Sequence, residues 1–121
     1  MNAAFETRLS LRAARGQNQQ QDAIDGWLRE RQAAGAAAGL AVLAEGAFFE
    51  LRVPPEVALE RLAAGCVCCI GLLPLQVTLT RLLRKRRPRS VLLLVADVAH
   101  IDRARALVTS GKLGVRLEDN G

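Results

Sequence analysis

Val91-Leu-Leu-Leu-Val95 is the clearest strand in the sequence, and a predicted helix lies on each side of it. On the N-terminal side, Leu72–Arg87 places leucines on one stripe and ends before Pro88, which predicts a helix. On the C-terminal side, Ile101–Ser110 is predicted as a helix that Gly111 terminates. A strand between two helices indicates an α/β fold, in which helices cover the faces of a parallel sheet.

The N-terminal half contains a similar alternation of strands and helices. Glu6–Arg12 alternates apolar and polar side chains, and Gly39–Ala44 is a continuous apolar run, so each segment is predicted as a strand. Between them, residues 13–21 are predicted as a Gln-rich loop. Asp22–Ala34 is predicted as a helix, because its apolar side chains fall at helical spacing.

Three shorter segments complete the predicted order: a candidate strand over Phe48–Val53, a short helix over Glu56–Ala64 and a last strand over Leu113–Leu117. We find no internal repeat and no linker, and 121 residues are about the size of one domain. The sequence therefore predicts a single α/β domain over residues 1–121, with a mostly parallel sheet and flanking helices.

Composition limits the class of partner. The chain has 17 Lys and Arg against 12 Asp and Glu, a net charge of +5, which is compatible with an anionic partner. Aromatic residues make up only 3%, too few to stack bases, so nucleic acid is not the expected partner. The cations of Arg84–Arg89 are explained more simply by a helix C-terminus, where positive charge complements the dipole, than by phosphate contacts.

Neither a leader nor a membrane span is apparent. No charged and then apolar segment follows Met1, and the longest charge-free run, Cys66–Thr80, contains Pro74 and is too short to cross a bilayer as a helix. Three cysteines cannot form an even disulfide framework. We therefore expect a cytoplasmic protein without membrane contact.

The sharpest chemical signal is the crowding of Cys66, Cys68 and Cys69 just before a predicted helix. The positive end of a helix dipole favours thiolate, and thiolates bind Zn²⁺ or Cu(I). Three sulfur ligands leave a fourth position open on a tetrahedral ion. The alternatives are a reactive or redox thiol, and cysteines that only pack in the core.

The fourth ligand is expected at the carboxyl edge of the predicted sheet. Glu45 follows the Gly39–Ala44 strand, and Asp97 and His100 follow the Val91–Val95 strand. In a parallel sheet these strand ends lie at one edge, and the cysteine loop is expected to open on the same edge. Glu45, Asp97, His100 or a water molecule would then complete the metal shell.

The cysteine segment Gly65-Cys-Val-Cys-Cys69 resembles the Gly-Cys-x-Cys-Cys motif of the CobW-like GTPases, a family of metal chaperones and metal-insertion factors. Leu40-Ala-Val-Leu-Ala-Glu-Gly46 resembles the family's apolar strand that ends near an Asn-Glu-x-Gly segment. Leu79–Leu94 is similar to its helix-then-strand return. The resemblance extends over about residues 5–110 and implies a three-layer, P-loop GTPase-like domain.

The chain departs from this family where the nucleotide would bind. Ala13–Gln20 stands in place of the P-loop but contains no Lys and no Ser or Thr, and Ala96–His100 replaces the acidic segment that would help hold Mg²⁺. No Asn-Lys-x-Asp motif is present to recognise guanine. GTP hydrolysis needs positioning, Lys and Mg²⁺ together, so neither GTP as a cofactor nor enzymatic activity is expected.

These observations predict a metal-binding accessory protein, a degenerate relative of the CobW-like GTPases that keeps the cysteine loop without hydrolysis. Its partner would be a metalloprotein client or a second copy of the chain. The alternative is a ligand-free interaction or dimerisation module with structural cysteines. A third reading is a residual nucleotide-binding enzyme that uses an unorthodox loop.

Overall fold

The computed structural model describes residues 7–46, 50–62 and 73–118. Within these ranges, five strands form one parallel sheet in the order β3-β2-β5-β1-β6. The strands are β1 (Thr7–Ala13), β2 (Leu40–Glu45), β3 (Ala58–Leu62), β5 (Ser90–Val95) and β6 (Val115–Glu118). The helices are α1 (Gly16–Ala33), α2 (Leu73–Arg86) and α3 (Ile101–Thr109), with the short 3-10 helix η1 (Val98–His100) before α3. The predicted α/β class and parallel sheet are confirmed.

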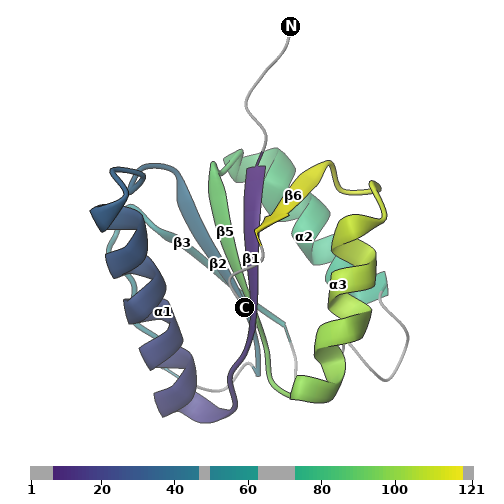
Figure 1. Ribbon diagram of the computed structural model, residues 1–121, viewed down its shortest axis with the longest axis horizontal. Helices are drawn as coiled ribbons and strands as arrows, with labels where there is room; N and C mark the ends of the chain where they lie inside the picture. The colour runs from purple at the N-terminus through teal and green to yellow at the C-terminus, as the bar shows by residue number, and fades with distance from the viewer. Residues whose placement is uncertain (1–6, 47–49, 63–72, 119–121) are drawn as a thin grey trace, which may run out of the picture.

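The direction in which the chain crosses the sheet explains the three layers. From β1 the chain passes over β5 to β2 through α1, and it later returns from β3 to β5 through α2. It then continues over β1 to β6 through α3. Parallel crossovers are right-handed, so a reversal of direction moves the helix to the other face. Accordingly α1 covers one face, and α2 and α3 cover the other (Figure 1).

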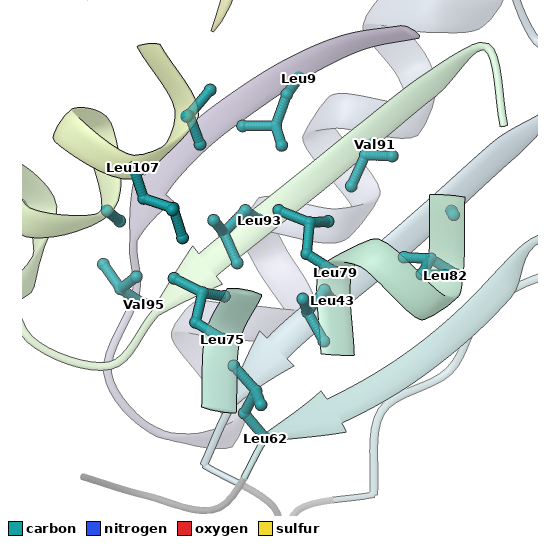
Figure 2. Close-up of a cluster of buried hydrophobic side chains, with 13 residues drawn as sticks. Leu9, Leu43, Leu62, Leu75, Leu79, Leu82, Val91, Leu93, Val95 and Leu107 are labelled. Atoms are coloured by element: carbon teal, nitrogen blue, oxygen red, sulfur yellow. The ribbon is translucent and has the colours of Figure 1, made fainter. Parts of the chain in front are cut away.

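Strand β5 is apolar on both sides because it lies between two cores. On the side of α2 and α3, Leu75 and Leu79 pack with Leu93 (Figure 2). On the side of α1, Trp27 belongs to a second cluster that contains Leu92. Each of these five side chains is fully buried. The predicted strand over 91–95 and the helices over 72–87 and 101–110 are thus confirmed, with small changes at their ends.

The predicted helix over Glu56–Ala64 is wrong, because Ala58–Leu62 is the edge strand β3. It pairs in parallel with β2, from Ala41 opposite Ala58 to Glu45 opposite Leu62. A pairing partner far along the chain satisfies the backbone groups of this short segment, and the local pattern does not reveal such a partner.

The candidate strand over Phe48–Val53 is also not observed in its described part, because residues 50–53 form no strand. Leu51 is instead buried in the core beneath α1. Phe48 lies outside the described residues.

Helix α1 begins six residues earlier than predicted, at Gly16 rather than at Asp22. The predicted loop over 13–21 is therefore mostly helical. The side chain of Gln19 accepts the backbone N–H of Arg15 at 2.8 Å, and Gln20 is fully buried. Gln is a good helix former, and the local hydrogen bond of Gln19 together with the burial of Gln20 keeps this turn in place.

The last predicted strand, Leu113–Leu117, is observed as β6. It begins two residues later than predicted and ends one residue later, at Val115 and Glu118. Gly114 has a positive φ of 66°, which turns the chain before the strand begins. Strand β6 pairs with β1 at the sheet edge.

Candidate functional site

Glu45 is a carboxylic acid at a position with no solvent exposure, at the end of β2. Its Oε1 accepts the backbone N–H of Ala96 at 2.8 Å, just beyond the end of β5. The same oxygen lies 3.1 Å from Nδ1 of His100. A buried carboxylate is costly without partners of this kind. Glu45 therefore joins the ends of two neighbouring strands and engages the imidazole that follows them.

His100 belongs to η1, and its side chain is 14% exposed. With Oε1 of Glu45 as the acceptor, Nδ1 donates the hydrogen bond, and in the neutral imidazole Nε2 is then the nitrogen with a lone pair. A carboxylate that fixes the tautomer and orientation of an imidazole in this way is common behind histidine metal ligands. The structure therefore brings together Glu45 and His100, two of the residues that the sequence predicted to share this edge.

Asp97 lies beside this pair but has other partners. Its Oδ1 accepts the backbone N–H of Ala99 at 3.0 Å, as the N-cap of η1, and its Oδ2 lies 3.3 Å from a guanidinium nitrogen of Arg15. The hydrogen bond from Ala99 holds the pKa of Asp97 below its ordinary value, and the positive charge of Arg15 lowers the pKa further. In the described structure Asp97 thus serves the turn between β5 and α3.

The three predicted sulfur ligands, Cys66, Cys68 and Cys69, lie outside the described residues. The described chain leads up to them from β3, which ends at Leu62 opposite Glu45. The backbone N–H of Gly46 donates to the carbonyl of Leu62 at 2.8 Å. Among residues 7–46, 50–62 and 73–118, no three His, Cys, Asp or Glu side chains gather closely enough to hold a metal ion.

Gln20 is part of this edge, although the sequence predicts a loop there. Its Nε2 donates to the backbone carbonyls of Glu45 at 2.6 Å and Ala14 at 3.1 Å, which ties α1 to the ends of β1 and β2. The helical spacing of Gln20 with Ile24 and Trp27 is the signal that could have identified it. A polar residue on an otherwise apolar stripe is a candidate for such a buried role.

A cavity of about 380 Å³ lies at the carboxyl edge where the chain leaves β1 and β5 toward opposite faces of the sheet. Ligands of open α/β sheets bind at such switch points. Arg15 and Asp97 both line it and form an ion pair. Its described lining contains no lysine, serine or threonine, the side chains that would hold phosphates and Mg²⁺.

None of the helices in the described part of the chain is long and apolar enough to cross a membrane. Comparison with known proteins returns no match, since no family model fits the sequence and no curated protein or solved structure is significantly similar to it. The geometry of the described residues must therefore support any functional conclusion.

Proposed function

We propose that this chain is a metal-binding accessory protein that holds Zn²⁺ or Cu(I) at the carboxyl edge of its sheet. The observation that carries the proposal is the pair formed by Glu45 and His100. The buried carboxylate engages Nδ1 of the imidazole, so that Nε2 is the nitrogen able to bind a metal. In this proposal Glu45 positions His100 instead of binding the ion itself, and Asp97 caps η1.

Cys66, Cys68 and Cys69 would supply the remaining ligands as thiolates. Cys66 lies four positions after Leu62 in the sequence, and Leu62 is paired with Glu45 between β3 and β2. Four extended residues span up to about 14 Å, so the chain is long enough to bring the first thiol toward His100. Three thiolates and one imidazole form a common tetrahedral set for Zn²⁺, and thiolates also suit Cu(I).

The proposal agrees with the resemblance to CobW-like GTPases, as a degenerate relative that keeps the metal loop. The lack of Lys, Ser and Thr over Ala13–Gln20 supports metal carriage without GTP hydrolysis. A metalloprotein client or a second copy of the chain would then receive or share the ion. We expect the protein to act in the cytoplasm, where thiols stay reduced.

Metal binding is tested on protein purified under reducing conditions. We expect about one metal ion per chain by elemental analysis, and added Zn²⁺ or Cu(I) should raise the unfolding free energy of metal-free protein. Mass action predicts about 2.7 kcal/mol at a hundredfold excess over the dissociation constant. Because thiols must lose protons to bind, the affinity should fall as the pH is lowered.

Two variants locate the ligands. The triple variant Cys66→Ser, Cys68→Ser and Cys69→Ser should lose the stabilisation by metal, and His100→Asn should weaken it. Asp97→Asn is the matched control. Its asparagine still caps the turn, so this variant should bind metal as the wild type does.

If neither metal changes the stability of the wild-type protein, the proposal is wrong, and the interaction module with structural cysteines is the better explanation. Equal metal affinity of the wild type and the triple serine variant would likewise contradict the ligand set. Turnover of GTP or ATP with Mg²⁺ would support the third reading, a nucleotide-binding enzyme.

A further inference from the structure

A second cavity, of about 550 Å³, lies at the amino edge of the sheet, the opposite edge from Glu45 and His100. Its lining includes four arginines from four separate parts of the fold, and we call it the arginine cavity. These residues are Arg8 of β1, Arg31 of α1, Arg89 just before β5 and Arg116 of β6. Segments far apart in the sequence thus present guanidinium groups to one space.

The arginine cavity exists because one helix covers the α1 face of a five-stranded sheet. On β1, Leu9 and Leu11 pack on the core of α2 and α3, so that Arg8, Ser10 and Arg12 alternate toward the α1 side. The register pairs Arg8 with both Ser90 and Arg116. In the described structure, this side of β1 and β6 is therefore a polar surface beside α1.

Backbone hydrogen bonds fix the chain segments that contain these arginines. The carbonyl of Gly39 accepts the N–H groups of Arg89 at 2.7 Å and Ser90 at 3.2 Å. The carbonyl of Arg89 accepts the N–H of Arg8 at 2.9 Å. At the end of α1, the N–H of Ala36 donates to the carbonyl of Arg31 at 2.8 Å. The cationic side chains therefore start from a backbone that is already ordered.

The described lining of the cavity is basic. It contains four arginines and no acidic residue, and the carboxylate of Glu118 lies 3.8 Å from Arg8 and 3.6 Å from Arg31. The Nε of Arg31 is buried and has no hydrogen-bond partner among the described residues. Guanidinium groups that converge on one space favour an anion with several acceptor oxygens.

We propose that the arginine cavity binds a compact anion with two or more linked phosphate groups. Guanidinium groups from four segments line one space, so together they can contact more than one phosphate group of a linked anion, and the volume is that of a small-ligand site. The described lining has no aromatic side chain to stack a base, so the phosphate chain is the part that is recognised. The negative end of the α1 dipole repels an anion at this place. This repulsion is weaker than the attraction from a single guanidinium–phosphate hydrogen bond.

The test is a calorimetric titration of the full chain with inorganic pyrophosphate, and with orthophosphate and sulfate at matched ionic strength. We expect one site that binds pyrophosphate more tightly than either single anion, with an affinity that falls as salt is added. The double variant Arg8→Gln and Arg116→Gln should bind pyrophosphate at least about tenfold more weakly, because two charge-assisted hydrogen-bonding groups are lost.

The matched control is the double variant Arg81→Gln and Arg84→Gln, which removes the same charge from α2 on the other face of the sheet. It should bind pyrophosphate as the wild type does. Arg89→Gln is a second test variant, since its side chain is exposed and its backbone bonds remain. The emission of buried Trp27 checks that each variant is folded.

Three results would overturn the proposal. The first is no binding heat with pyrophosphate at low salt. The second is equal weakening of binding by both double variants, which would indicate only a general effect of net charge. A short DNA duplex that binds while pyrophosphate neither binds nor competes would instead indicate a surface for nucleic-acid backbone.

Discussion

Glu45 shows how one buried side chain links two strands that are distant in sequence. Its carboxylate accepts the N–H of Ala96 and contacts His100, which is 55 positions further along the chain. Removal of this side chain leaves the donors of Ala96 and His100 without their acceptor in a partly buried setting.

We predict that Glu45→Ala lowers the free energy of unfolding by about 1–3 kcal/mol, measured by urea denaturation. Glu45→Gln is the matched variant, because its amide oxygen can still accept from Ala96, and it should cost less. An equal loss in the two variants would show that the hydrogen bonds to Ala96 and His100 do not matter for stability.

Asp97 gives a prediction about pH. Its pKa is lowered in the folded protein, first by the hydrogen bond from Ala99 and then by the positive charge of Arg15. Because the folded-state pKa is lowered, the unfolded state binds the proton more tightly than the folded state does. The ionised side chain of Asp97 therefore stabilises the fold at pH values above the unfolded pKa of about 3.9. This stabilisation is lost as the pH falls through the folded-state value.

Asp97→Asn keeps the cap and removes the charge. We therefore expect the variant to be less stable than the wild type at neutral pH. The difference should disappear as the pH falls below about 4. Denaturation curves at several pH values measure this, and a difference that does not change with pH would contradict the assigned role.

At the scale of elements, α2 has one buried and one exposed side. Leu79 is fully buried against the sheet, whereas Val77 is 47% exposed on the same helix (Figure 2 shows the buried side). We predict that Leu79→Ala costs about 2–5 kcal/mol of unfolding free energy, because it leaves a cavity in the core. Val77→Ala should change stability by less than about 0.5 kcal/mol. Similar losses at the two positions would contradict this orientation of α2.

The connection between α1 and β2 depends on two glycines with positive φ. Gly35 has a φ of 70°, and a Cβ added to it would meet open space. Gly39 has a similar φ of 69°, but a Cβ added to it would lie 3.2 Å from the backbone nitrogen of Arg89. We predict that Gly35→Ala costs about 1–2 kcal/mol, from the backbone conformation alone. Gly39→Ala should cost more, because the contact with Arg89 is added. Equal thermal stabilities of the two variants would show that the contact with Arg89 adds no cost at Gly39.

For the whole molecule, the two cores share the central strand β5, which makes independent unfolding of either layer costly. Trp27 reports on the core beneath α1, and far-ultraviolet circular dichroism reports on α1, α2 and α3 together. We expect the two signals to change together in one denaturant transition. Separate midpoints would show that the layers unfold independently and would contradict a single domain over residues 1–121.

The two edges of the sheet carry different chemistry. The carboxyl edge holds the buried pair of Glu45 and His100, and the amino edge holds the arginine cavity. This separation means that the metal proposal and the phosphate proposal can fail independently, because no residue is shared between them.

The fold class could be predicted from the sequence because its signals are local. The apolar run over 91–95 and the leucine stripe of α2 each reflect burial that repeats with the period of the element itself. The parallel sheet, the β5 strand and the helices around it were accordingly confirmed. The resemblance to the CobW-like GTPases and the cysteine ligands stay predictions, since the described residues do not include Cys66, Cys68 and Cys69.

Only the tertiary structure decided the features that depend on distant partners. Ala58–Leu62 is a strand because β2 lies beside it, and Gln20 is helical and buried because the ends of β1 and β2 accept its hydrogen bonds. The sequence placed Glu45 and His100 at one edge, but their contact required β2 and β5 to be neighbours. A periodic pattern records whether a residue is buried, whereas strand order determines which residues meet, because it depends on where crossovers return the chain.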